Sequence, residues 1–281
     1  MILILASYRR TSANLLAALI FLVAGVSSMS AQAQGRLKAH FAISMTGVPV
    51  GQIVWTVTID DKHYTTSASG KASGVLSVLV NGEGSVVTRG MVVDGKLAPQ
   101  DFTSNITDDE GNNELRMNFE GGDVKDLIGR EPPQAGRLPV TDADRRGVAD
   151  PLTAMLMPAG DDPFASANCK RVLPIFDGRR RYNLVLSFGR IDKITIAGGY
   201  SGFVLVCGVV LQPIAGYRAD SMLVKYVGGR RDMELWFAPI AGTSIVAPIR
   251  VLMPTLIGTL EIRADQFAMT LPSPAPNAPP R

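Results

Sequence analysis

Short runs of the chain alternate apolar and polar residues with a period of two. In residues 37–46 every second side chain is apolar: Leu37, Ala39, Phe41, Ile43 and Met45. The next run repeats the pattern with Ile53, Trp55, Val57 and Ile59. Successive side chains of a β-strand point to opposite faces, so this period is typical of strands that bury one face. No segment holds a clean helical period over about twelve residues, so the pattern predicts a mainly β protein.

Turn-forming residues separate these runs at intervals of roughly ten to fifteen residues. They include Gly47–Gly51, Asp94–Gly95 and Gly121–Gly122. Glycine (28 residues) and proline (18) are too frequent for a helical bundle and supply many turns. The spacing favours an antiparallel meander over alternating strands and helices. We predict a single curved antiparallel sheet that forms an open barrel or a spiral, with one or two short helices.

The second half of the chain continues the strand pattern. We expect strands at residues 182–188, 191–196, 203–211, 232–237 and 256–263. Prolines interrupt the apolar stretch between residues 237 and 262, which favours strands with tight corners over a membrane helix. The best helix candidate is Pro151–Met157, because Asp150 can cap it and proline suits the first helical position. Residues 75–80 could form a short helix or a strand.

The N-terminus has the order of a secretory signal peptide. Arg9 and Arg10 precede an apolar run of about ten residues, which is short of the roughly 20 that a membrane helix needs. Small residues follow, and we place cleavage after Ala33, with an uncleaved anchor as the alternative. A long loop at residues 129–146 could divide two domains, but we prefer one. The predicted organisation is therefore a signal peptide (1–33), one β-rich domain (34–270) and a proline-rich flexible tail (271–281).

Export changes how the only two cysteines are interpreted. In an oxidising compartment, Cys169 and Cys207 are expected to form a disulfide. The alternative is a pair of buried free thiols. A redox-active pair is not favoured, because the two residues lack the C-x-x-C spacing that lowers a thiol pKa.

Composition and motifs exclude several classes of function. The net charge of +3 is too small to indicate a nucleic-acid-binding protein. No nucleophile elbow, metal-binding H-E-x-x-H or nucleotide-binding glycine loop occurs, so we expect no catalytic residue, no metal and no cofactor. His40 and His63 fit surface positions on strands. A carboxylate pair could be drawn from Asp150, Asp161, Asp162 and Asp177, but their spacing selects none of them.

Two short clusters are the strongest site candidates. The first is Asp150–Ala154, which begins with the capping Asp150 and Pro151. The second is Phe176–Tyr182, where Asp177–Gly178 is typical of a tight turn. Three arginines follow this turn, and they are either the basic tip of a hairpin or an anion site. Because alternate residues of a strand share a face, only Arg179 and Arg181 would contact the same anion.

Several short motifs occur along the chain in a fixed order: Gly47–Gly51, Asp150–Ala154, Leu173–Arg179, Pro248–Arg250 and Gly258–Leu260. Over residues 36–267 this order resembles an exported bacterial family, the domain of unknown function 3108. The two cysteines and Pro213–Tyr217 resemble its alphaproteobacterial versions. The resemblance implies a periplasmic, β-rich protein and supplies no reaction. It also suggests a likeness in shape to envelope-integrity proteins with a spiral sheet.

These observations favour a non-enzymatic protein of the cell envelope, located in the periplasm. It would bind a lipid, a lipoprotein or another apolar ligand in the concavity of the sheet. The alternative is a structural or scaffolding module that binds protein or cell wall. A hydrolase that uses buried aspartates is a third and weaker hypothesis. We expect no integral membrane segment in the mature chain, and the sequence leaves the oligomeric state open.

Overall fold

The computed structural model describes residues 35–72, 82–108, 111–129 and 136–270. The chain divides into two units, Met1–Gln32 and Ala33–Arg281, and all described residues belong to the second. The predicted signal peptide (1–33), the segment 75–80 and the predicted tail (271–281) lie outside the described residues.

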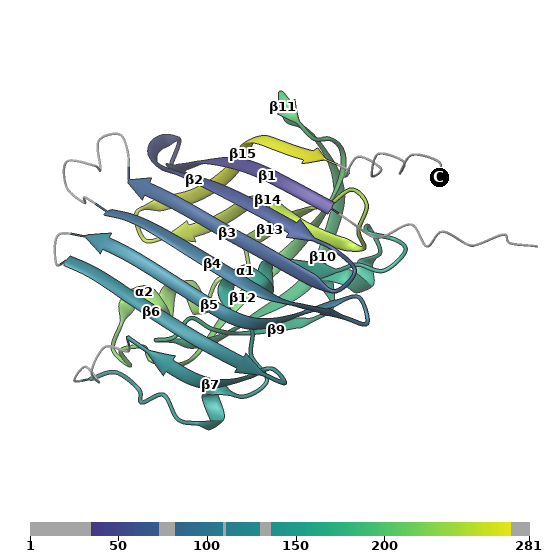
Figure 1. The fold of residues 1–281 in the computed structure, drawn as a ribbon. Helices are drawn as coiled ribbons and strands as arrows, with labels where there is room; N and C mark the ends of the chain where they lie inside the picture. The colour runs from purple at the N-terminus through teal and green to yellow at the C-terminus, as the bar shows by residue number, and fades with distance from the viewer. Residues whose placement is uncertain (1–34, 73–81, 109–110, 130–135, 271–281) are drawn as a thin grey trace, which may run out of the picture. The chain divides into compact units, whose positions relative to one another are not determined.

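Fifteen strands make up most of the described chain (Figure 1). The strands of the first half are β1 (Gly35–Met45), β2 (Val48–Ile59), β3 (His63–Ala72), β4 (Gly82–Val93), β5 (Lys96–Asp108), β6 (Gly111–Glu120) and β7 (Asp123–Ile128). Those of the second half are β8 (Met157–Pro158), β9 (Val172–Phe176), β10 (Arg181–Thr195), β11 (Gly198–Gly199), β12 (Ser201–Ala215), β13 (Met233–Pro239), β14 (Ile245–Thr255) and β15 (Gly258–Thr270). Two short α-helices, α1 (Pro151–Met155) and α2 (Met222–Gly228), and two 3-10 turns, Ala143–Arg145 and Ser166–Cys169, complete the described elements.

All the strands belong to one sheet, in the order β7-β6-β5-β4-β3-β2-β1-β15-β14-β13-β12-β10-β9. Every long pairing in it is antiparallel, and the sheet does not close, because β7 and β9 remain at its two ends. β8 adds to β14, and β11 adds to β15. This arrangement confirms the prediction of a mainly β fold with a single open antiparallel sheet and short helices.

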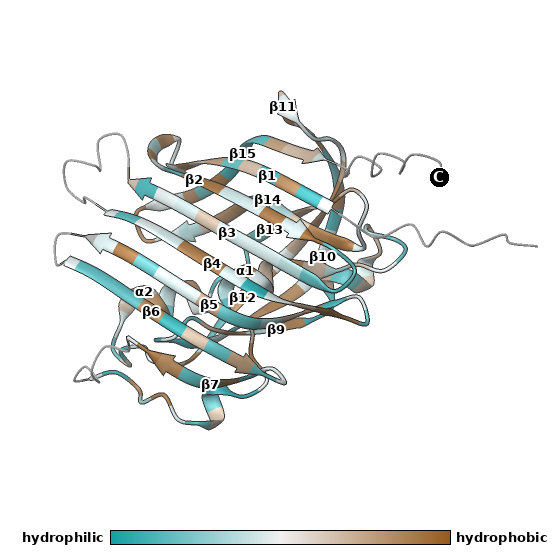
Figure 2. Cartoon of the chain, viewed as in Figure 1, coloured by the Kyte–Doolittle hydropathy of each residue, from teal (hydrophilic) through white to brown (hydrophobic). Residues whose placement is uncertain are grey.

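The main core lies between the two halves of this sheet. Apolar and polar residues alternate along β1 and β2 (Figure 2), and most of the apolar side chains that point inward are buried. They pack against residues of β12, β13 and β14 in one cluster, which includes Leu37, Phe41, Trp55, Val57, Val206, Ala238 and Ile249. Burial of one face therefore explains the period-two pattern of the first half.

Strands β12 and β13 are buried on both faces. Val204 and Val206 join the main core, whereas Leu205 and Cys207 face a second apolar cluster with Phe237, and all five side chains are fully buried. A strand with two dry faces needs apolar residues at successive positions. This explains why the sequence of β12 is a continuous apolar run, whereas that of β1 alternates.

Prolines within the strands coincide with irregularities in pairing. The register shifts next to Pro49 in β2, Pro99 in β5, Pro213 in β12 and Pro248 in β14. Proline has no N–H to donate to a ladder, so bulges and edges are where strands tolerate it. The expectation of strands in this region is thus confirmed, but Pro239, Pro248 and Pro254 lie within β13 and β14 and not at the corners between strands.

Three boundaries differ from the sequence-based expectation. β2 begins at Val48, so only Thr46 and Gly47 form the turn, both with positive φ. β10 runs unbroken from Arg181 to Thr195, where two strands were expected, because a bulge at Gly189 shifts the alternation. Helix α1 ends at Met155, since Met157 pairs with β14 as part of β8.

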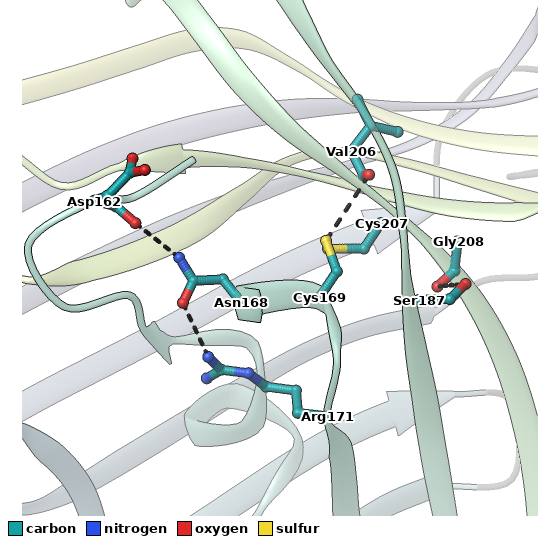
Figure 3. Close-up of a disulfide and its surroundings, with 8 residues drawn as sticks. All are labelled: Asp162, Asn168, Cys169, Arg171, Ser187, Val206, Cys207 and Gly208. Carbon is teal, nitrogen blue, oxygen red and sulfur yellow. Dashed lines mark hydrogen bonds between the residues drawn. A yellow bond between two sulfur atoms is a disulfide. The ribbon is translucent and has the colours of Figure 1, made fainter. Parts of the chain in front are cut away.

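Cys169 and Cys207 form the predicted disulfide, and no cysteine of the described chain is free (Figure 3). Both side chains are fully buried in the second apolar cluster. The neighbouring loop is fixed by Asn168, whose Nδ2 donates to the carbonyl oxygen of Asp162 at 2.9 Å. Arg171 donates to Asn168 Oδ1 at 3.2 Å and to the carbonyl oxygen of Pro158 at 2.9 Å. The disulfide therefore attaches this loop to the face of β12 away from the main core.

Removing the disulfide with Cys169→Ala and Cys207→Ala should lower the free energy of unfolding. The bond spans a sequence separation of 38 residues. On the loop-entropy relation, a closure of that length contributes about 4 kcal/mol. Urea denaturation of the oxidised protein and the double variant measures the difference. The native protein denatured in the presence of reductant should have the same urea midpoint as the variant. Equal midpoints for all three samples would contradict this account.

Candidate functional site

The two predicted clusters meet where the ends of the open sheet come together. Val148 N donates to the carbonyl oxygen of Gly122, in the turn between β6 and β7, at 2.8 Å. Ala149 pairs in parallel with Ile175 of β9: its N–H donates to Pro174 and its carbonyl accepts from Phe176, both at 3.0 Å. Residues 147–150, which we call the bridging segment, thus connect the β6–β7 turn with β9. The next residues begin helix α1, which contacts β3, β4, β5 and β9.

Asp150 ends the bridging segment as a completely buried carboxyl group. Its Oδ1 caps α1, as predicted, by accepting from the N–H groups of Leu152 (3.0 Å) and Thr153 (3.1 Å). The same oxygen accepts from Thr88 Oγ1 of β4 at 2.7 Å. Its Oδ2 has no hydrogen-bond partner. One carboxylate oxygen therefore holds the helix and the sheet together while the other is unpaired.

Burial raises the pKa of Asp150, and its hydrogen bonds to Thr153, Thr88 and Leu152 oppose that shift. A second polar contact lies one helical turn away, where Tyr64 of β3 and Thr153 share a hydrogen bond of 2.6 Å. Burial also raises the pKa of Tyr64. Two strands thus bind α1 through polar side chains inside an otherwise apolar region.

The Asp177–Gly178 turn connects β9 with β10, as predicted. Asp177 Oδ1 accepts from the N–H groups of Arg179 (2.8 Å) and Arg180 (2.6 Å), which is the turn chemistry expected of aspartate. Gly178 has a φ of +90°, and a Cβ at this position would lie 2.5 Å from a methyl group of Leu115 in β6. The turn therefore fits closely against the opposite end of the sheet. Phe176, fully buried, continues this contact among the apolar side chains of β6.

The structure does not place Arg179 and Arg181 on one face of a strand, as the sequence predicted. β10 begins at Arg181, so Arg179 lies in the turn and strand alternation does not put the two on one face. Arg181 donates to the carbonyl oxygen of Tyr182 at 2.6 Å and to Asn183 Oδ1 at 2.8 Å. The guanidinium of Arg180 lies 5.8 Å from the centre of the Tyr217 ring. Anion contact by Arg179 and Arg181 remains a prediction.

A hollow of about 500 Å³, lined mostly by residues with polar side chains, lies on the face of β1–β5 opposite the main core. Two rows of directly paired residues form it. One row is His40, Val54, Ser69, Ser85 and Asn105, and the other is Gln52, Lys71, Glu83 and Thr107. Short serines on the two middle strands form the floor, and longer side chains surround it. We call this feature the outer-face hollow.

Sequence reasoning missed the outer-face hollow. Its members looked like ordinary solvent-facing positions of alternating strands, and His40 was assigned to the surface. The available signal was the pair of small residues at Ser69–Gly70 and Gly84–Ser85 on successive strands. Their alignment depends on the register between β3 and β4, which a single sequence does not reveal.

Two other features were sought in the part of the chain that the structure covers, a metal-ligand cluster and a membrane-spanning helix. There, no three histidine, cysteine or acidic side chains gather as metal ligands would. Among the same residues, no helix has the length and apolar character needed to span a membrane.

A family model for proteins of unknown function, DUF3108, matches residues 40–265. The chain belongs to the DUF3108 family. The match extends from β1 into β15, so it includes the outer-face hollow, the bridging segment and both cysteines of this DUF3108 protein. The sequence-based resemblance is therefore confirmed.

One solved structure similar to this DUF3108 chain is a beta-barrel-like protein of the domain of unknown function DUF1849 from Brucella abortus. The two share 11% sequence identity with a TM-score of 0.46, over 84% of this chain and 98% of the other. No curated protein sequence matches the chain.

Asp150→Asn should make the free energy of unfolding less sensitive to pH. The amide keeps an oxygen that accepts the same three hydrogen bonds, and its nitrogen replaces the unpartnered Oδ2. Because the folded pKa of Asp150 is raised, its favourable contribution is complete below the unfolded pKa of about 3.9 and is lost as pH rises through the folded value. The variant should therefore gain stability relative to the native protein as the pH rises above about 4.

Urea denaturation at several pH values tests this expectation. Asp161→Asn, at an exposed aspartate, is the matched control and should follow the native profile. A difference between Asp150→Asn and the native protein that stays constant across the range would show that the carboxyl group does not titrate as described.

Proposed function

We propose that this DUF3108 protein is an exported, non-enzymatic module of the cell envelope that binds a cell-wall polymer in the outer-face hollow. The proposal rests on one observation. Two cross-strand rows of mostly polar residues lie side by side on the outer face of the sheet. Hydroxyl and amide side chains line the hollow, together with one lysine and one glutamate. These groups can form hydrogen bonds with the hydroxyl and amide groups of a glycan with attached peptides. Because the rows run across four or five strands, a ligand there would lie across the strands.

Two features support the export part of the proposal. The N-terminal sequence has the arrangement of a signal peptide, with a periplasmic destination for the mature chain. The disulfide between Cys169 and Cys207 is fully buried, and such bonds form and persist in oxidising compartments. A periplasmic location agrees with both.

The packing of the inner face favours this proposal over a lipid carrier. A lipid in the concavity of the sheet would need the space beside Trp55 and Phe41. Those side chains instead contact the second half of the sheet, in the cluster that includes Val206 and Ala238. The outer-face hollow is open, and polar groups line it. We therefore favour the envelope module that binds cell wall over the apolar-ligand hypothesis.

The local chemistry of the aspartates does not favour a hydrolase. Asp150 is completely buried and its Oδ1 holds helix α1. Asp177 Oδ1 accepts two N–H groups of its own turn, and Asp162 Oδ1 accepts from Phe164 N at 2.9 Å. These contacts give each of the three aspartates a structural role.

Co-sedimentation with purified cell-wall sacculi tests the proposal. Ser69→Tyr places a ring on the floor of the outer-face hollow and should weaken binding about tenfold, because the ring fills the space that the polymer would occupy. Thr65→Tyr adds the same ring on the same face of β3, outside the hollow, and should bind like the native protein. Both changes place an aromatic residue on a solvent-facing strand position, which strands tolerate.

The proposal fails if the native protein stays in the supernatant, or if both tyrosine variants bind equally well. Circular dichroism of each variant confirms that the sheet is intact.

A further inference from the structure

Two hairpin turns project from one end of the sheet without a charged residue in either. The first lies between β1 and β2 and has the sequence Ser-Met-Thr-Gly-Val-Pro-Val at residues 44–50. The second lies between β14 and β15 and has the sequence Met-Pro-Thr-Leu-Ile-Gly-Thr-Leu at residues 253–260. We call them the paired tips.

The paired tips expose large apolar side chains. Ile257 is 80% exposed, Leu256 is 53% exposed and Val48 is 48% exposed. Leu256 and Ile257 are consecutive and both exposed, which distinguishes this turn from a single scattered apolar side chain on the surface. Neither the outer-face hollow nor the bridging segment uses these residues.

Hydrogen bonds connect the two tips and hold part of the β14–β15 turn. Thr46 N donates to the carbonyl oxygen of Thr259 at 2.8 Å, which connects one tip with the other. Thr255 Oγ1 donates to the carbonyl oxygen of Gly258 at 2.7 Å and accepts from Ile257 N at 3.4 Å. These bonds satisfy some of the polar groups of the β14–β15 turn, which lowers the cost of removing them from water.

The turn at residues 240–244, at the far end of β14, is uncharged like the tips, but charged turns lie at the far ends of β2 and β4. The turns there contain Asp60, Asp61 and Lys62 between β2 and β3, and Asp94 between β4 and β5. Antiparallel pairing places these turns at the far end from the paired tips. The two tips thus differ from these charged turns, although the tip end of the sheet also carries charge outside the tips, at Asp108 of β5 and at residues 230–232 before β13.

We infer that the paired tips insert into the interface of a lipid membrane and anchor the protein there reversibly. The tips project, so they suit a soft surface that they can enter, whereas a groove would suit an inserted peptide. They carry no charge, which is the requirement for entering the acyl boundary of a bilayer. This inference goes beyond the proposed function and does not depend on cell-wall binding.

Sedimentation with phosphatidylcholine vesicles, and with vesicles of phosphatidylethanolamine and phosphatidylglycerol, tests the inference on the mature chain. The protein should bind both compositions similarly and resist added salt, because the insertion is apolar. Leu256→Ser with Ile257→Ser should lower the partition coefficient by about tenfold or more, since these two side chains supply most of the inserted area. The control is Val93→Ser with Val172→Ser, two valines 49% and 52% exposed on β4 and β9, and it should bind like the native protein.

Fluorescence of Ile257→Trp gives a second readout that does not depend on affinity. The native tryptophans, Trp55 and Trp236, are 4% and 7% exposed, so a change on adding vesicles reports the new ring. Its emission should shift to shorter wavelength and become protected from a water-soluble quencher.

Three outcomes would overturn the inference. The first is no vesicle binding by a folded native protein, and the second is binding that needs anionic lipid and disappears in salt. The third is self-association without lipid that the double serine variant abolishes, because the tips would then be a contact between two copies of the chain.

Discussion

The contact between the two halves of the sheet is the constraint on which the remaining structure depends. The inner face of β1–β3 is large and apolar, and the only part of the described chain that covers it is the second half of the sheet, with helix α1. Trp55 and Val57 on one side meet Val206 and Ala238 on the other. As a result β12 and β13 must be apolar on both faces. Polar ligands are consequently restricted to the outer face and to the ends of the strands.

A sheet that is covered in this way still has two edges, which are a hazard when they stay unpaired. The bridging segment reduces this hazard by binding the β6–β7 turn through Val148 and β9 through Ala149. The cost is that Asp150 enters the interior with one unpartnered oxygen. Buried polar groups of this kind usually contribute specificity rather than net stability. Here the hydrogen bond from Thr88 to Asp150 fixes the position of α1 against β4. An apolar contact would leave that position less well defined.

The predictable parts of the fold are those that depend on local chemistry. Alternation predicted β1 and β2, because one face of each is solvated, and Asp150 with Pro151 predicted the start of α1. The same reasoning divided β10 in two, because the bulge at Gly189 reverses the alternation within one strand. The meeting of Asp150 with Thr88, and the alignment of Ser69 with Ser85, depend on pairing between distant segments. A single sequence contains no record of that register, so neither the environment of Asp150 nor the outer-face hollow could be predicted.

The outer-face hollow and the paired tips share strands β1 and β2, which relates their two proposed ligands. Val48 lies at the β1–β2 tip, and Gln52, four residues along β2, belongs to the nearer row of the hollow. A strand rises about 3.3 Å per residue, so tips at a lipid surface would hold that row about 13 Å above it. The rows of the hollow run across the strands, so they are parallel to the end of the sheet at which the turns lie. A polymer bound in the hollow would then extend along the membrane surface, in the orientation of a wall strand that lies over a bilayer.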